Sequence, residues 1–578
     1  MGRREVLEEP VRLPVRFNGS LLLMSLLLGL VAFLVVTPLF LMILNSFQIS
    51  KPGDPMVYGL QGWQEVFTSA GMLAPIYNTF SLAITRQLIA LVGGIFLAWL
   101  LARTDIPMRG WLEFMFWLSF FMPVLPVTMG WILLLDPKYG LLNQWLLKFP
   151  FIHEPPFNIY SFWGVVWAHL ATTTLGIKVM LLTPAFRNMD AVLEESSRIS
   201  GAGALSTLAR IIAPVMMPAI LVTTVLGVIR SLEAFEVELL LGVPIGLHVY
   251  STKIHELVIS EPPEFPPAMA LGTVFLAALF LLVTLQRRVI GRRIYTTVTG
   301  RGFSRHPTPL GRWKYPAFAL VLLLALLITV VPIILLVMGT FMKLFGFFYI
   351  PEPWTLDNWL EVLKDPVIFR SLRNTLFIGL GAGGIGVLLY SLIAYVVVKT
   401  RFAARGLLDI LSWLPWSIPG ILLGIALLWT FLGTKVFLPI YGTIYILIIA
   451  MVIKSMPFGT QVIKSVMLQL GNELEEASRI TGASWFYTYR RILFPLLLPA
   501  LLTVGLVCFI SAARDISTVV LLATGQTRTL SLLMLDFATE AEFEKATVVA
   551  VLIVLLVVVA ALIARALGGH LSIRGEAG

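Results

Sequence analysis

The chain has little charge and almost no cysteine, and both shortages narrow its class. Only 13% of its 578 residues are Asp, Glu, Lys or Arg, whereas soluble globular chains carry about 25%. Because 58% of the residues are hydrophobic, much of the chain is too apolar for water, and a bilayer is the solvent that it fits. The single cysteine, Cys508, has no partner for an intrachain disulfide and cannot form a thiolate cluster around a metal.

Signatures of several function classes are missing as well. The six histidines show no H-E-x-x-H spacing, and no G-x-x-x-x-G-K-[ST] phosphate loop occurs. The net charge of +10 does not point to nucleic acid, because Lys and Arg gather in short segments between apolar runs without stacking aromatics around them. No paired carboxylates, histidine cluster or nucleophile–base spacing stands out in the apolar runs. An enzyme embedded in the membrane is therefore the least favoured class, and we expect neither a metal site nor a cofactor in this chain.

Long apolar runs are what the sequence has in abundance. A membrane-spanning helix needs about 20 mostly apolar residues, and windows of that length predict twelve spans and an all-α polytopic membrane protein. The first run is too long for a signal-peptide core, so we expect an uncleaved first helix. The predicted spans are 20–46, 77–102, 111–135, 160–184, 211–232, 266–286, 316–342, 372–398, 406–432, 439–464, 493–513 and 546–567.

The loops between the runs carry their positive charge on alternate sides. The segment from Arg287 to Lys314 holds eight Lys or Arg and no Asp or Glu, which is typical of a cytoplasmic loop. Loops two connections away are basic too, whereas the alternate loops are acidic or mixed, most clearly from Glu233 to Glu264. Twelve spans then place both termini in the cytoplasm, in agreement with the loop charges.

Similar segments recur in the two halves of the chain. "YNTFSLAI" in the first half matches "RNTLFIGL" in the second, with Asn78 and Asn374 separated by 296 residues. Later equivalents are 281 residues apart, so the first half has fifteen extra residues, which we place in the predicted outer loop 136–158. We predict two parallel six-helix repeats, residues 1–299 and 300–578, related by an axis along the membrane normal.

One polar stretch is also repeated, as "LEESSRISGAG" and "LEEASRITGAS", each in a predicted cytoplasmic loop. Each copy predicts a short amphipathic helix, near 188–203 and near 470–484. We expect a Glu–Arg ion pair at i,i+4 in each helix, and a glycine that ends or bends the helix and lets another backbone approach. The residues concerned are Glu194, Glu195, Arg198 and Gly201 in the first copy, and Glu475, Glu476, Arg479 and Gly482 in the second.

For either copy alone, an ordinary surface helix with a stabilising ion pair would explain the residues. Two copies in equivalent loops, each followed by an isoleucine and then a proline, favour a helix that docks a two-fold partner. In the second copy Leu470, Leu474, Ala477 and Thr481 recur at helical spacing on one face.

The repeated stretch resembles the EAA loop of binding-protein-dependent ABC importer permeases. Glu476-Ala477-Ser478, Gly482, Ile492 and Pro495 match the pattern in the second copy. The first copy has two serines where alanines are usual, and Ala213 where leucine is usual before the proline. The equivalent residues of the first copy are Glu195-Ser196-Ser197, Gly201, Ile211 and Pro214.

The resemblance implies a type I permease fold in a bacterial cytoplasmic membrane. Each loop would form a coupling helix seated in a groove of a cytoplasmic ATPase dimer, which would hold the ATP and Mg²⁺. A substrate-binding protein outside would deliver cargo, and the permease would move it inward by alternating access. The segments "YGLLNQWL", "LEAFEVELLLGVP" and "TLSLLMLDFATEAEFEKATVVAVL" are similar to those of fused, two-half ferric-iron permeases. Ferric iron is the expected cargo, with thiamine, polyamines, phosphonates or other small solutes as alternatives.

Charged residues at two equivalent span ends are candidates for a gate on the translocation path. At the end of the fifth span stand Arg230, Glu233 and Glu236. By the offset of 281 residues, Glu233 is equivalent to Arg514, which precedes Asp515 at the end of the eleventh span. In the family these helices line the path, so we expect an outer gate or a cargo vestibule. Interfacial anchoring and helix-end salt bridges are the alternative.

Three other basic residues, Arg86, Lys178 and Lys454, fall inside predicted spans. We expect them to snorkel or to pair between helices, without a substrate role. The rival from another class is a secondary transporter of six-plus-six design, which would need intramembrane proton or cation sites and no ATPase. The repeated polar stretch argues against it.

Overall fold

The computed structural model describes residues 19–50, 56–187, 189, 196–197, 199–291, 307–471 and 473–575. Within these ranges the chain is helical, and its only β pairing consists of isolated bridges. Nine helices there are long and apolar enough to cross a bilayer, and three pairs of shorter helices meet at sharp bends. Counting each bent pair as one span gives twelve, the number predicted from the sequence.

The nine continuous spans follow the predicted apolar runs. Many of their side chains face outward, for example Leu22 and Leu26 of the first helix, which are 59% and 60% exposed and fit contact with lipid. Three of the spans contain a π-helical turn, η1 (Leu170–Thr174), η6 (Leu326–Val330) or η9 (Tyr489–Leu493). The helices are α1 (Gly19–Asn45), α3 (Ala70–Arg103), α7 (Phe162–His169) with α8 (Leu175–Arg187), α14 (Phe265–Gly291), α15 (Lys314–Ala325) with α16 (Val331–Thr340), α18 (Pro366–Lys399), α21 (Ile444–Gln469), α23 (Trp485–Thr488) with α24 (Phe494–Arg514), and α26 (Phe543–Gly575).

Three of the predicted spans, 111–135, 211–232 and 406–432, are bent pairs of helices, and the sequence analysis did not predict the bends. Residues 109–119 meet α5 (Val124–Leu135) at 103°, and residues 405–417 meet α20 (Gly420–Gly433) at 111°. Pro123 and Pro419 stand immediately before α5 and α20. Proline lacks the N–H that a continuing helix needs and disfavours helical geometry in the residue before it, so the chain turns there.

The third bend separates residues 205–215 from α12 (Met217–Leu232), at 78°. Its equivalent in the second half is continuous, because α24 runs through Pro499 without a break. The segment before this bend comprises α10 (Ala204–Thr207), η2 (Leu208–Ile212) and α11 (Ala213–Val215). The segments before the other two bends begin with α4 (Arg109–Phe121) and α19 (Arg405–Trp413).

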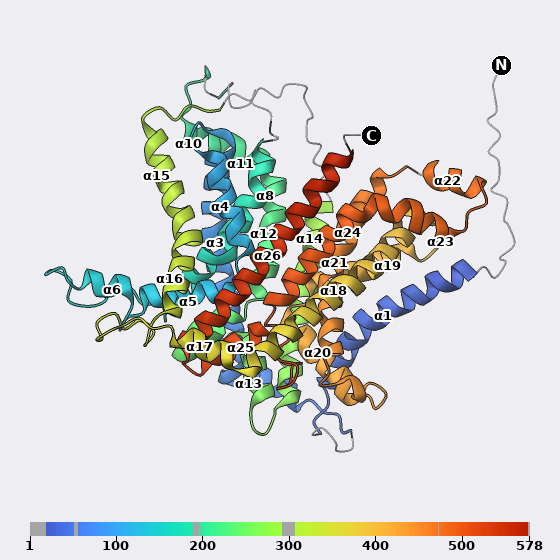
Figure 1. Ribbon diagram of the computed structural model, residues 1–578, viewed down its shortest axis with the longest axis horizontal. Helices are drawn as coiled ribbons and strands as arrows, with labels where there is room; N and C mark the ends of the chain where they lie inside the picture. The colour runs from blue at the N-terminus through green and yellow to red at the C-terminus, as the bar shows by residue number, and fades with distance from the viewer. Residues whose placement is uncertain are drawn as a thin grey trace.

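The short helices lie on two opposite faces of the molecule (Figure 1). α10, α22 (Glu473–Ile480) and the last turns of α26 are in the upper part of the view, whereas α13 (Tyr250–Ile259), α17 (Asp357–Lys364) and α25 (Leu530–Thr539) are in the lower part and α6 (Leu141–Leu146) projects at the left. The repeated polar stretches thus share one face and the acidic or mixed loops share the other, as the loop charges predict. α6 occupies the loop to which we assigned the fifteen extra residues. Another short helix, α2 (Gln61–Thr68), precedes α3.

The repeated Asn-Thr pair has the same structural role in both halves. Asn78 Nδ2 donates to the carbonyl of His248 at 3.0 Å, and Asn374 Nδ2 donates to the carbonyl of Arg528 at 2.9 Å. The threonine after each asparagine accepts a hydrogen bond from the first amide of α13 or α25, at 3.0 and 2.9 Å. In each half the motif therefore ties a loop on the lower face of Figure 1 to a long span.

The first span of each half packs against the other half. α1 contacts α19 and α20 of the second half, and α15 and α16 contact α4 and α5 of the first. The two repeats are thereby interlocked. The predicted boundary, between residues 299 and 300, falls in 292–306, outside the described residues, and stays a prediction.

One of these crossings depends on a glycine. A Cβ built on Gly130 of α5 would lie 2.7 Å from the carbonyl oxygen of Pro332 in α16. Because the neighbour is backbone, Gly130→Ala should push the helices apart and lower the stability of the folded chain by about 1–3 kcal/mol. Thermal unfolding of the purified chain in nanodiscs measures this. Gly384→Ala in α18, where a Cβ would meet nothing within 4 Å, is the matched control and should not destabilise. Equal unfolding temperatures for the two variants would contradict the assignment.

Candidate functional site

The second copy of the repeated stretch forms α22, which is held against the end of α18. The Tyr395 hydroxyl donates to Glu475 Oε2 at 3.2 Å, and Lys399 Nζ lies 3.9 Å from Glu475 Oε1. The predicted ion pair with Arg479 exists, but its atoms are 3.8 Å apart and Arg479 is 63% exposed. The buried Glu475 therefore anchors α22 to its own chain, and Glu476 is the exposed glutamate of the pair.

Both copies are tied to the end of a long span by an equivalent basic residue. Lys399 Nζ donates to the carbonyl of Leu470 at 2.6 Å, and Arg103 Nη1 donates to the carbonyl of Met189 at 3.1 Å. The two basic residues are separated by 296 residues and the two acceptors by 281, which are the offsets of the repeat. The entry to each loop is thus fixed in the same way.

A pair of buried hydroxyls closes each loop. Ser478 Oγ lies 2.8 Å from Thr488 Oγ1, and Ser197 Oγ lies 2.8 Å from Thr207 Oγ1. Each threonine also donates to the backbone carbonyl four residues before it, at 3.2 Å. Our sequence analysis missed this pair, although a serine with a threonine ten residues later stands in both copies.

The conserved geometry extends to the two glycines, since Gly201 and Gly482 have φ values of +80° and +82°. The amide after each glycine donates to the carbonyl five residues before it, at 3.1 Å in both copies. This bond, with the glycine in the left-handed conformation, is a common way for an α-helix to end. A Cβ on either glycine would meet nothing of this chain within 4 Å. The glycine is therefore required by backbone conformation, and the expected close approach of another backbone does not occur within the described chain.

Each loop also presents an isoleucine outward. Ile199 and Ile480 are equivalent by the offset of 281 and are 89% and 86% exposed. In the second copy Leu474 is 45% exposed, so the predicted apolar face of α22 points away from its own chain. Glu194, Glu195 and Arg198 of the first copy lie outside the described residues. We call the exposed faces around Ile199 and Ile480 the two loop surfaces.

The hydroxyl pairs can be tested by a double-mutant cycle. Ser478→Ala and Thr488→Val remove the two sides of one pair, and their interaction energy should be about 1 kcal/mol because the pair is one buried, neutral hydrogen bond. Thermal unfolding of the two single variants and of the double variant gives this value, and Ser197→Ala with Thr207→Val should give a similar one. Ser465→Ala, at an exposed hydroxyl, is the control. Additive effects in both cycles would contradict a shared bond.

The predicted gate residues come together in one cluster between the two halves. Arg230 Nη1 is 2.9 Å from Glu233 Oε2, and its guanidinium lies 5.9 Å from the ring centre of Trp416 in the second half. The Glu236 carboxylate interacts electrostatically with Arg514 and Asp515. We call this set, completed below by one lysine, the inter-half charge cluster.

Lys454 of α21 belongs to the inter-half charge cluster, although the sequence analysis gave it no such role. Its Nζ pairs with Asp515 Oδ2 and donates to Thr518 Oγ1 at 2.9 Å. The expectation of pairing between helices holds for all three basic residues in spans, since Arg86 pairs with Glu238 and Lys178 Nζ donates to the carbonyl of Thr223 at 2.7 Å. Among the described residues no three His, Cys, Asp or Glu side chains are grouped as metal ligands.

Comparison with known proteins points to a transport family. Residues 382–573 match the family model described as a binding-protein-dependent transport system inner membrane component. The ferric transport system permease protein FbpB of Actinobacillus pleuropneumoniae is 28% identical over 403 residues, 67% of this chain and 55% of that protein. A putative ferric transport system permease protein FbpB 1 of Haemophilus influenzae is 28% identical over 380 residues, 64% of this chain and 58% of that protein.

A third relative covers more of the chain. A probable ABC transporter permease protein, y4fN of Sinorhizobium fredii, is 25% identical over 506 residues, 85% of this chain and 86% of that protein. The alignment with each of the two ferric permeases takes in little more than half of that relative's length.

Proposed function

We propose that this chain is a transport permease of the binding-protein-dependent ABC importer family and the membrane subunit of an ATP-driven importer. It takes cargo from an extracytoplasmic binding protein and passes it inward by alternating access. Separate cytoplasmic ATPase subunits hold the ATP and Mg²⁺, and this chain contributes no catalytic residue. Its membrane is the bacterial cytoplasmic membrane, with both termini and both loop surfaces on the cytoplasmic side.

The observation that carries the proposal is the likeness of the two loop surfaces. Both have a basic side chain from a long span that binds the start of the loop, a buried hydroxyl pair, a glycine with positive φ and an outward isoleucine. The two basic residues are 296 residues apart, and the other features are 281 residues apart. Two like surfaces on one face suit a partner with two like grooves. An ATPase dimer is such a partner, and each of its subunits would seat one loop.

Ferric iron is the cargo that we propose, because two relatives carry that cargo in their names. Iron would arrive on its binding protein, so the permease need not hold it at a metal site. Thiamine, polyamines, phosphonates and other small solutes are the alternatives. Stimulation of the ATPase by candidate binding proteins loaded with each cargo distinguishes them.

We further propose that the inter-half charge cluster is a gate on the translocation path. It brings the ends of α12 and α24 together at the interface between the halves, where a path related by the repeat axis would run. Its charges of both signs neutralise one another when the halves meet there. Separation of the halves would remove the attraction of Glu236 to Lys454 and Arg514 and open the path.

Co-purification followed by reconstitution tests the function. The tagged chain is expressed with its candidate ATPase, purified in detergent and placed in proteoliposomes with the binding protein. We expect a stable complex of one permease with two ATPase subunits, and uptake that requires ATP. Uptake by the permease alone, driven by a proton or cation gradient, would favour a secondary transporter and overturn the proposal.

A further inference from the structure

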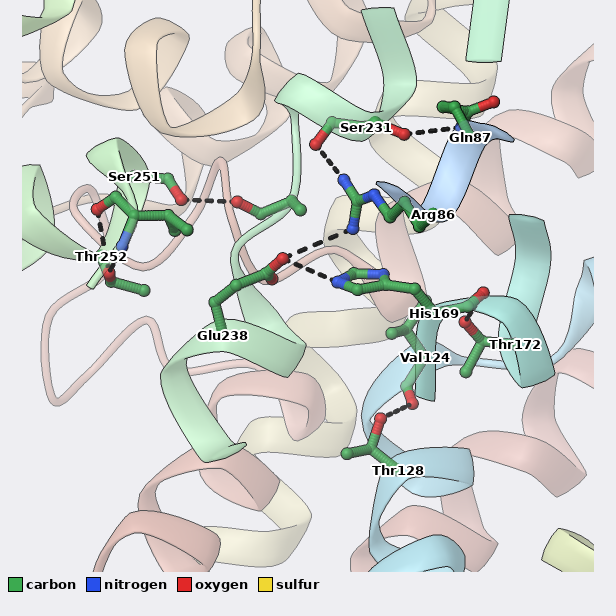
Figure 2. Close-up of polar contacts among 12 residues, drawn as sticks. Arg86, Gln87, Val124, Thr128, His169, Thr172, Ser231, Glu238, Ser251 and Thr252 are labelled. Atoms are coloured by element: carbon green, nitrogen blue, oxygen red, sulfur yellow. Dashed lines mark hydrogen bonds and ion pairs between the residues drawn. The ribbon is translucent and has the colours of Figure 1, made fainter. Parts of the chain in front are cut away.

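A buried ionic cluster lies inside the first half. Arg86 Nη1 is 3.4 Å from Glu238 Oε1, and His169 Nε2 is 2.7 Å from the same oxygen (Figure 2). The side chains of Arg86 and Glu238 are 2% and 1% exposed. The three residues come from α3, α7 and η3 (Glu238–Gly242), so the cluster joins three separate elements.

Arg86 also binds the start of the connection, residues 232–237, that leads from α12 to Glu238. Its second amino group donates to the carbonyl of Ser231, in the last turn of α12, and Gln87 Nε2 donates to Ser231 Oγ at 2.6 Å (Figure 2). One guanidinium thus binds both sides of residues 232–237. We call Arg86, His169 and Glu238 the clamp.

The second half builds the same fold without a clamp. The offsets of the repeat place Ala382, Ala450 and Val519 at the positions of Arg86, His169 and Glu238, and all three are buried. Burial of ionised groups is costly, and apolar residues often serve the packing as well or better. The chain itself therefore shows that the fold does not require these charges, and their presence in the first half calls for another role.

The clamped connection carries two members of the inter-half charge cluster, Glu233 and Glu236. Glu236 and Glu238 are two positions apart on a helical turn, which points them about 200° apart around the axis. Glu238 contacts Arg86 and His169 behind the connection, whereas Glu236 interacts electrostatically with Lys454, Arg514 and Asp515 of the second half, as well as with Glu238. Fixing the one carboxylate therefore fixes the direction of the other.

We propose that Arg86, His169 and Glu238 are positioning residues that hold residues 232–237 so that Glu236 meets the charges of the second half. The equivalent connection of the second half is held differently, because Asp515 Oδ1 accepts the amide of Thr518 at 3.0 Å while its other oxygen pairs with Lys454. Lys454, Asp515 and Thr518 all belong to the second half, so each connection is held by contacts within its own half. This inference rests on the proposed role of the cluster in translocation.

Cross-linking of the full chain in nanodiscs tests the geometry without any need for transport. Glu236→Cys and Arg514→Cys are combined in a Cys508→Ala background and treated with a short bifunctional thiol reagent. Arg86→Met with Glu238→Leu removes both charges together and keeps similar volumes, so that no lone charge stays buried. We expect this double change to slow cross-linking at least fivefold. An unchanged rate in a folded protein would overturn the positioning role.

Lys178→Met is the matched control, because Lys178 is another buried cation of the first half that has no part in the clamp. It should leave the cross-linking rate unchanged. If it slowed the reaction as much as Arg86→Met with Glu238→Leu, the effect would be general loosening and the inference would fail.

Uptake gives a second readout that a purely structural role would not produce. In the reconstituted importer Glu236→Gln should lower uptake in the clamped protein and cause little further loss after Arg86→Met with Glu238→Leu. Losses that multiply, in parallel with thermal stability, would contradict positioning. If the complex shows no ATP-driven uptake while cross-linking still depends on the clamp, the proposed function fails and the positioning role stands.

Discussion

Replacement of both Ile199 and Ile480 by aspartate is expected to abolish ATP-driven uptake and ATPase co-purification while the permease stays folded. Both side chains are almost fully exposed on this chain, so neither contributes to its core. Seating one isoleucine in a partner's apolar groove is worth about 1.5–3 kcal/mol, and two grooves double that figure. Affinity should therefore fall by roughly 10²–10⁴-fold, and the desolvation of a buried aspartate adds to the loss.

Single substitutions measure the contribution of each loop surface to ATPase binding. Ile199→Asp or Ile480→Asp alone leaves one loop seated, so binding should weaken by roughly 10–100-fold. Ile259→Asp on α13, on the opposite face, is the control, since Ile259 is 60% exposed and far from either loop surface. Pull-down titration with purified ATPase measures each affinity. Normal binding by the double variant would remove the basis of the proposed coupling.

The sequence was sufficient to predict the number of spans, because burial in lipid imposes long apolar runs. It did not show the bends at Pro123 and Pro419, since an average over 20 residues ignores direction. The signal was available: the two prolines are 296 residues apart, at equivalent positions of the repeat. A proline shared by both halves within a predicted span is better taken as a break than as a tolerated residue.

The polar sites were likewise predicted only in part. The offset of the repeat was sufficient to pair Glu233 with Arg514, and the structure brings both span ends into one cluster. Contacts that occur in only one half could not be predicted from the repeat. Glu238 lies 152 residues from Arg86, and only the folded chain brings them together. Repeat symmetry thus predicts what the halves share, whereas the clamp arises where they differ.

Reversal of one charge in the inter-half charge cluster should have the second large effect. Arg514→Glu would place a third acidic group beside Glu236 and Asp515. A pair of like charges about 4 Å apart at a partly solvated site repels by roughly 4 kcal/mol. We therefore expect uptake to fall at least about 100-fold, while the ATPase still binds because the loop surfaces are unaffected. Radiolabelled uptake into proteoliposomes, with complex assembly checked by gel filtration, measures both.

The compensating change makes the gate hypothesis specific. Arg514→Glu combined with Glu236→Arg restores opposite charges across the interface and should recover a substantial part of the uptake, because the attraction depends on the pair and not on which half carries which sign. Arg528→Glu is the control reversal, since it breaks the partly exposed ion pair of Arg528 with Asp536, 2.9 Å apart, and such a pair is worth at most about 1 kcal/mol. Normal uptake by Glu233→Ala and Arg514→Ala, in fully assembled complexes, would end the gate hypothesis. Loss without recovery in the swapped pair would instead favour fixed anchoring of the helix ends, the alternative reading of the same charges.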